Sequence, residues 1–395
     1  MIVAAGSSEV AIAFVEIGAM VLGLALLSRL AGRFGLTAIP LYLVAGLALG
    51  QGGVVQLDVS EDFFEIGAEI GVLLLLFTLG LEYSDSELRS GLKSGLRPGL
   101  LDMLLNAVPG LALGLILGWE PIAALLLAGV TWITSSGVVS KVLSDLGRLG
   151  NRETPAVLNL LVIEDLAMAV YLPVVAALIV GGTMLATLTS VAIALVAVAV
   201  ILLAALRYGR RLSDLIAGGS DETFLLTVFG ITLLVAGIAQ QLDVSGAIGA
   251  FLVGLALSGR AERRANTLIA PLRDLFAAMF FVFFSFQIDP ADLLDAAIPA
   301  VGLAIVTCGT KVATGWYAAG QTGAGPKGRL RAGTVMMARG EFSIVIAALG
   351  SSLVDGPDLG ALAAGYVLVT AIVGPLAAKY ADRVPVNRLP RVAPA

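Results

Sequence analysis

The chain has 395 residues, of which 58% are hydrophobic and 13% charged, and its formal net charge is −5. Soluble domains have about 45–50% apolar and about 25% charged residues, so this composition excludes a soluble globular protein and indicates a polytopic membrane protein. The low net charge argues against a nucleic-acid-binding protein, and a single cysteine excludes a disulfide framework, an iron–sulfur cluster and a thiolate zinc site.

Thirteen segments are apolar and long enough to cross a membrane, for which a helix needs about 20 mainly apolar residues. In chain order they lie near residues 9–30, 35–50, 60–81, 96–117, 121–143, 153–180, 184–206, 222–240, 243–259, 266–287, 292–319, 329–352 and 358–379. The second and ninth segments are short and rich in glycine. We therefore expect an all-α membrane protein with about 13 transmembrane helices.

The basic residues between these segments predict their orientation. With the N-terminus outside, 22 of the 24 Lys and Arg residues fall in loops or the tail on one side, and the loops of the other side have acidic residues instead. This is the positive-inside pattern of cytoplasmic loops. We expect a multi-pass protein of the cell (inner) membrane, with the N-terminus outside and the C-terminus in the cytoplasm. The two remaining basic residues, Lys311 and Arg339, lie inside predicted spans and point to a site.

An internal repeat appears when the sequence is shifted by roughly 207 residues. The shift aligns residues 44–49 (VAGLAL) with 252–257 (LVGLAL), and residues 77–82 with 284–289. Because seven spans, an odd number, separate the paired segments, the two copies are expected to be inverted. Inverted repeats are typical of alternating-access transporters. The predicted parts of a single transporter domain, residues 1–395, are a first repeat near 35–180, a linker helix near 184–206 and a second repeat near 243–379.

The same shift pairs two polar interruptions, at residues 131–137 (TWITSSG) in the fifth span and 338–343 (ARGEFS) in the twelfth. Matching breaks in the two halves indicate a transport site, because unwound backbone frees carbonyls for a cation and half-helix ends have partial charges. Arg339 is expected at a half-helix C-terminus and Glu341 at the next N-terminus; the alternative is a structural ion pair. The candidate oxygen ligands in the first break are Thr131, Thr134, Ser135 and Ser136. Their alternative role is hydrogen bonding within their own helix.

Two adjacent acids, Glu164 and Asp165, stand at the middle of the sixth span. One acid at this depth costs at least about 2.5 kcal/mol, so a function is expected. Neighbouring helical residues point about 100° apart, so one carboxylate can face an ion cavity while the other meets Lys311. Burial favours the protonated acid and an ammonium favours the carboxylate, so such a group could exchange H⁺ for a monovalent cation. The alternative is a static Glu164–Lys311 bridge. Asp102 and Glu69 are expected off the midplane, facing interfaces or neighbouring helices.

Several motifs resemble those of the cation:proton antiporter-2 family, the Kef-type transporters. They are residues 134–136 with 138–143 and 147–150, 163–166 (IEDL), 246–254 (GAIGAFLVG), 271–276 (PLRDLF), Lys311 and 339–342 (RGEF). The resemblance covers nearly the whole chain. It implies a thirteen-helix inverted-repeat fold with crossing broken helices, a homodimer, and exchange of potassium or sodium for protons. It also implies that Asp165 is the ion-binding aspartate.

Two departures from the family pattern bear on mechanism and regulation. Glu164 stands where relatives often have Gln, Asn or Asp, which leaves the choice of ion and the stoichiometry open. Many Kef-type proteins continue into a cytosolic nucleotide-binding domain, whereas this sequence ends at Ala395, shortly after the last span. No such domain is expected, and any gating would come from a separate soluble subunit.

The sequence therefore predicts a secondary antiporter, not an enzyme, that exchanges K⁺ or Na⁺ for H⁺. Asp165 would bind the cation or the proton in turn, helped by the oxygens of the first break, with Glu164 and Lys311 as a coupled pair beside it. No tightly bound cofactor and no nucleic-acid partner are expected. A cation channel with the same charged centre, or a sodium-coupled solute symporter, remains as an alternative.

Overall fold

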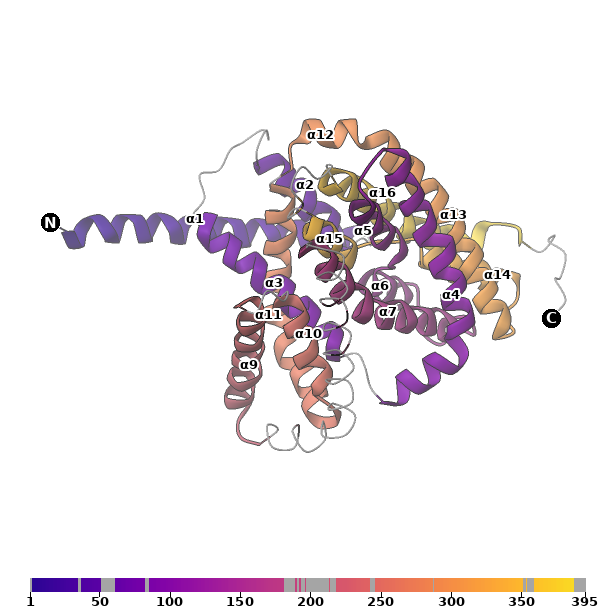
Figure 1. The fold of residues 1–395 in the computed structure, drawn as a ribbon, viewed down its shortest axis with the longest axis horizontal. Helices are drawn as coiled ribbons and strands as arrows, with labels where there is room; N and C mark the ends of the chain where they lie inside the picture. Colours follow the sequence, from indigo (N-terminus) through magenta and orange to yellow (C-terminus); the bar gives the residue numbers. More distant parts are fainter. Residues whose placement is uncertain are drawn as a thin grey trace.

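A computed structural model shows how the expected spans are arranged. It describes residues 2–34, 37–50, 61–81, 85–180, 218–241, 246–286, 288–350 and 359–386, and the single residues 189, 192, 196, 213 and 353. All regular structure in these residues is helical, as predicted (Figure 1). The predicted linker helix near 184–206 lies outside the described residues apart from the single positions.

The helices follow one another in the order of the predicted spans. The first half contains α1 (Ile2–Arg33), α2 (Ile39–Leu49), α3 (Glu61–Leu81), α4 (Asp85–Ile116), α5 (Pro121–Trp132), α6 (Ser136–Asp145) and α7 (Thr154–Val180). The second half contains α9 (Asp221–Gln241), α10 (Gly246–Ala256), α11 (Gly259–Phe286), α12 (Pro290–Asp295), α13 (Ala297–Gln321), α14 (Pro326–Val335), α15 (Glu341–Leu349), α16 (Leu359–Tyr380) and a short 3₁₀ helix (Ala381–Arg383). In the described part of the chain, seven segments are long and apolar enough to span a membrane, and α2 is a shorter apolar helix.

Three predicted spans each consist of two helices. The spans near 121–143 and 329–352 are interrupted at the predicted polar breaks, between α5 and α6 and between α14 and α15. The span near 292–319 was wrongly predicted as one continuous helix. It begins as α12, where Asp289 caps the N-terminus by accepting a hydrogen bond from the Ala291 amide and Pro290 occupies the first turn. The chain then turns at Ala296 into α13.

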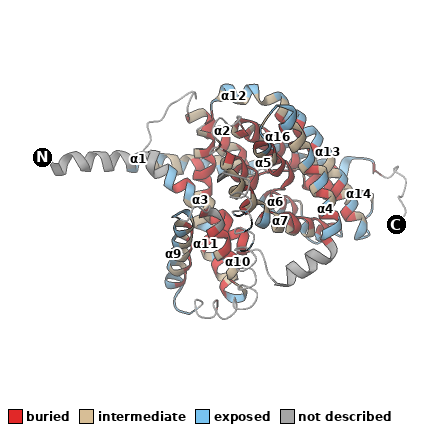
Figure 2. Ribbon diagram, in the orientation of Figure 1, coloured by how far each residue is buried: buried red, intermediate tan, exposed pale blue. Residues whose placement is uncertain are grey.

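The helices pack in two groups, and the broken helices belong to the second. In one group α3 packs on α10 and α11, α2 packs on α11, and α10 packs on α9. In the other group α4 packs on α5, α7 and α13, and α13 packs on α14 and α16. Figure 1 shows α9, α10 and α11 on one side, α4, α13 and α14 on the other, and α5, α6, α7 and α15 between them. Buried residues concentrate along the inner helices (Figure 2), so the broken helices lie within the core.

A close helix crossing positions α13 against the broken helix α14. A Cβ placed on Gly315 of α13 would lie 2.5 Å from the Cα and the N of Gly333 on α14. Small residues at such a contact let two membrane helices approach backbone to backbone. This crossing fixes the height of α13, which contains Lys311, relative to the break that contains Arg339.

The helix bounds repeat at the spacing that the sequence alignment suggested. A shift of 207 residues carries both ends of α2 onto both ends of α10. The breaks after α5 and after α14 follow at closely matching positions.

Candidate functional site

The two helix breaks are in direct contact at the centre of the protein. The Ser135 amide donates to the Ala338 carbonyl over 3.0 Å, and the Ser135 hydroxyl donates to Glu341 Oε2 over 2.7 Å. The same hydroxyl accepts the Val138 amide at 3.2 Å and so caps the N-terminus of α6. One serine therefore joins the start of α6 to the start of α15.

Arg339 binds the C-terminal ends of both broken helices. Its guanidinium donates to the Thr131 carbonyl at 3.0 and 2.8 Å, and to the Met336 and Met337 carbonyls at 3.1 Å each. The residue is completely buried. Because the last carbonyls of a helix have no partner within the helix and carry partial negative charge, a cation there satisfies and stabilises both ends.

Arg339 and Glu341 do not form the ion pair with each other that was the alternative interpretation. Among the described residues no ion pair includes Arg339, and Glu341 accepts from Ser135 instead. Both residues do lie where the sequence placed them, after α14 and at the start of α15.

A lysine and two acids from three helices form a buried cluster next to the breaks. Lys311 Nζ of α13 lies 2.7 Å from Asp102 Oδ2 of α4 and 2.8 Å from Glu164 Oε1 of α7. The side chains of Lys311 and Asp102 are completely buried, and that of Glu164 is 1% exposed. The predicted contact of Glu164 with Lys311 is therefore present.

Asp102 is the residue that sequence reasoning missed. It was expected off the midplane at an interface or a neighbouring helix, but it is the second carboxylate on the only lysine of this cluster. It also accepts hydrogen bonds from Trp132 Nε1 at 3.2 Å, Thr314 Oγ1 at 3.0 Å and Asn106 Nδ2 at 2.9 Å. The available signal was the spacing of Asp102 and Asn106, four residues apart and so on one face of an otherwise apolar span.

The neighbouring carboxylates of α7 face different surroundings, as their helical spacing predicts. Glu164 accepts from Lys311 and from the amide and hydroxyl of Thr134 in the first break. Asp165 instead lines a cavity of about 970 Å³, together with Ser136 and Glu341.

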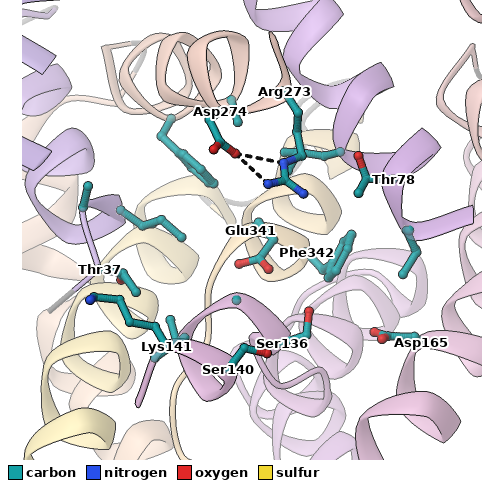
Figure 3. Close-up of a pocket in the computed structure, with 18 of the residues that line it drawn as sticks. Thr37, Thr78, Ser136, Ser140, Lys141, Asp165, Arg273, Asp274, Glu341 and Phe342 are labelled. Carbon is teal, nitrogen blue, oxygen red and sulfur yellow. Dashed lines mark hydrogen bonds and ion pairs between the residues drawn. The ribbon is translucent and has the colours of Figure 1, made fainter. Parts of the chain in front are cut away.

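The cavity gathers polar side chains from several helices. Figure 3 shows Ser136, Ser140 and Lys141 of α6, Asp165 of α7, Arg273 and Asp274 of α11, and Glu341 and Phe342 of α15 around it. Arg273 and Asp274 form an ion pair of 2.7 Å on one wall. A hydrated monovalent cation could enter such a space and find the carboxylates of Asp165 and Glu341 inside.

Of the four hydroxyl residues in the first break, only Ser136 is among the residues that line this cavity. The Thr134 hydroxyl donates to Glu164 and the Ser135 hydroxyl donates to Glu341. The Thr131 hydroxyl donates to the carbonyls of Asn106 and Ala128, at 2.8 and 3.1 Å. Thr131 thus hydrogen-bonds partly within its own helix, which was the alternative raised for it, and joins α5 to α4.

Comparison with known proteins decides the family. The model of the transmembrane sodium/hydrogen exchanger family matches residues 19–379. The chain belongs to the sodium/hydrogen exchanger family. Among the exchanger's relatives, the K(+)/H(+) antiporter subunit KhtU of Bacillus subtilis (strain 168) is 36% identical over 378 residues, which cover 93% of each chain. The glutathione-regulated potassium-efflux system protein KefC of Klebsiella pneumoniae (strain 342) is 28% identical over 360 residues, 88% of this chain and 57% of KefC.

The fold of the exchanger also matches that of a solved structure. The sodium proton antiporter MjNhaP1 from Methanocaldococcus jannaschii at pH 8 superposes with a TM-score of 0.71 at 16% identity, covering 95% of this chain and 99% of MjNhaP1. The sodium/proton antiporter fold, with inverted repeats and crossing broken helices, and the resemblance to Kef-type transporters are both confirmed.

Proposed function

We propose that the chain is a secondary active antiporter that exchanges a monovalent cation, K⁺ in preference to Na⁺, for H⁺ by alternating access. The observation that carries the proposal is the position of Asp165, a carboxylate at the middle of a membrane helix that lines a cavity of about 970 Å³ beside the crossing breaks. An acid so deep in a membrane protein is costly, so its presence points to a function such as binding a transported ion.

In this mechanism Asp165 binds either the cation or the proton, because one negative charge can be neutralised by either. The neutralised site can then pass the apolar barrier as the helices move, whereas the bare carboxylate resists the passage. Ser136 and Glu341 line the same cavity and would supply further oxygens. Glu164 and Lys311 would act as the coupled pair, while Thr131, Thr134 and Ser135 hold the break in shape through the contacts described above. Arg339 would support the site by binding the helix ends.

The preference for K⁺ rests on relatives whose names state potassium as the cation, among them KhtU and KefC.

We also propose an organisation of the chain that fits this transport mechanism. We place the first repeat near residues 35–180, the linker near 184–206 and the second repeat near 243–379. The N-terminus would lie outside the cell and the C-terminus in the cytoplasm.

We also propose a homodimer in the lipid bilayer, and a separate soluble subunit that regulates transport. KhtU is named as an antiporter subunit, which supports the presence of a further component for this chain. Copurification of a second polypeptide with the natively expressed protein tests this part independently of transport.

Proteoliposomes with a pH dye inside test the main proposal. Addition of KCl or NaCl should move protons in the opposite direction to the cation, without an applied voltage. Asp165→Asn should abolish this flux, while Asp221→Asn serves as the matched control, since Asp221 is exposed, is paired with Arg264, and neither of these two residues lines the cavity. Cation conductance without proton movement would instead indicate a channel, and proton flux retained in Asp165→Asn would remove Asp165 from its role.

A further inference from the structure

Lys311 has two carboxylate partners in the described part of the chain but only one positive charge. Its ammonium contacts Asp102 Oδ1 at 2.8 Å, Asp102 Oδ2 at 2.7 Å and Glu164 Oε1 at 2.8 Å. Two of these three contacts go to Asp102. The cluster therefore has one negative charge in excess when both acids are ionised, and the chemistry depends on which acid is the lasting partner of the lysine.

Hydrogen-bond donors occupy the acceptor positions of both carboxylate oxygens of Asp102. Oδ1 accepts N–H donors from Lys311 and Asn106, and Oδ2 accepts N–H donors from Lys311 and Trp132. The indole and ammonium groups can only donate, and two N–H donors occupy both lone pairs of each oxygen. The Thr314 hydroxyl adds a fifth donor. A proton on Asp102 would displace at least one of these buried donors.

Glu164 has a different set of partners. Oε1 accepts from Lys311 and from the Thr134 hydroxyl, and Oε2 accepts the Thr134 amide. A hydroxyl can reverse from donor to acceptor, and an oxygen with a single donor keeps one lone pair for a proton. Glu164 also adjoins Asp165, which lines the cavity. Glu164 can therefore take up a proton without leaving a buried donor unpaired.

We propose that Asp102 is a positioning residue that holds Lys311 as its permanent counter-ion, so that Glu164 is a second exchangeable carboxylate beside Asp165. The inference rests on the proposed antiport function and deepens it. In the cation-loaded state Glu164 is ionised and Asp165 binds the cation; in the proton-loaded state each of the two acids holds a proton. Two protons then cross for each monovalent cation, and every cycle moves one net charge.

Charge movement per proton tests the inference, because a merely structural role of Asp102 would change the amount or rate of transport but not this ratio. The same proteoliposomes are used for dye-detected proton flux and for currents on a solid-supported membrane after KCl or NaCl jumps. Wild-type protein should give a transient current along with the flux. In Asp102→Asn, Glu164 becomes the only counter-ion of Lys311, so exchange should proceed through Asp165 alone, and the current should fall to that of protein-free liposomes while flux persists.

Two more variants keep the test decisive if Asp102→Asn does not fold. Glu164→Gln removes the second exchangeable acid and should also retain flux without current. The double variant Asp102→Asn/Lys311→Met removes both members of the permanent pair, leaves Glu164 exchangeable, and should restore the wild-type current per proton. Asp221→Asn, at an exposed residue away from the cavity, is the control with unchanged flux and current.

The failures of the two proposals are distinguishable. Absence of cation-dependent proton flux in the wild type overturns the antiport function itself. Flux without current in the wild type, or wild-type current per proton in Asp102→Asn or Glu164→Gln, leaves antiport intact and overturns the role of Asp102.

Discussion

Replacement of Arg339 is the perturbation whose effect on stability follows most directly from the geometry. The buried guanidinium donates to three carbonyls, at the ends of two different helices, over distances of 2.8–3.1 Å. In Arg339→Gln the side chain is shorter and uncharged, so it cannot reach both helix ends. The C-termini of α5 and α14 then lose their common counter-charge.

The expected loss can be worked from the contacts. A buried acceptor that loses its partner costs about 1–3 kcal/mol, so three carbonyls set a lower bound of about 3 kcal/mol. The loss should stay below the sum of the three maximum costs, because the Tyr366 hydroxyl already lies 3.5 Å from the Thr131 carbonyl and can move closer to it. We expect Arg339→Gln to lower the free energy of unfolding by about 3–5 kcal/mol, the range typical of removing one partner from a buried charged group.

Reversible unfolding by SDS in mixed micelles, followed by the fluorescence of the three tryptophans, measures this difference. Arg273→Gln is the matched control. Among the residues that the structure describes, Arg273 is paired with its neighbour Asp274 alone, at 2.7 Å, and its side chain is 28% exposed, so its loss should cost less than about 1 kcal/mol. If Arg339→Gln unfolds at the same free energy as Arg273→Gln, the carbonyl contacts do not hold the two helix ends together, and the reasoning is refuted.

Two further predictions concern the helix crossing and the cavity. Gly315→Ala should destabilise the protein by about 1–3 kcal/mol in the same titration, because the new methyl group overlaps the backbone of Gly333. Gly309→Ala on the same helix should be neutral or stabilising by up to about 1 kcal/mol, since its Cβ meets nothing within 4 Å; equal effects of the two would contradict the close crossing. Ser140→Cys, in a Cys308→Ser background, should react with a membrane-impermeant maleimide only from the cytoplasmic side, because Ser140 lines the cavity next to Lys141. Labelling from outside alone would reverse the proposed orientation.

Much of the fold could be predicted from the sequence because the bilayer imposes strong rules on length and polarity. Apolar runs near the required length coincide with helices, and the breaks near Thr134 and Arg339 were visible as polar residues in apolar spans. The turn at Ala296 was missed for the same reason. The residues on both sides of it are apolar enough to read as one span, and the capping role of Asp289 depends on local backbone geometry rather than on composition.

Site residues could be predicted where their charge inside a membrane identifies them. They could not be predicted where only the packing of helices determines which residues meet. Glu164, Asp165 and Lys311 stood out because charged groups inside a membrane are rare. The partner of Lys311 was harder to choose, because Asp102 lies 209 positions away in the sequence and only the packing of α4 on α13 brings the two together. The sequence also does not show in which direction a hydroxyl group points. For this reason Thr131 was grouped with Ser136, although of the two only Ser136 is among the residues that line the cavity.

The position of Asp102 changes how the charges of the site are counted. With Glu164 as the sole partner of Lys311, the pair would be neutral and exchange would proceed through Asp165 alone. With Asp102 bound to the same ammonium at 2.7–2.8 Å, the lysine is neutralised without Glu164. In the proposed mechanism, this one aspartate on α4 separates a one-proton exchanger from a two-proton exchanger, although it is not among the residues that line the cavity. For this reason charge per transported proton, rather than transport rate, is the quantity that distinguishes the two mechanisms.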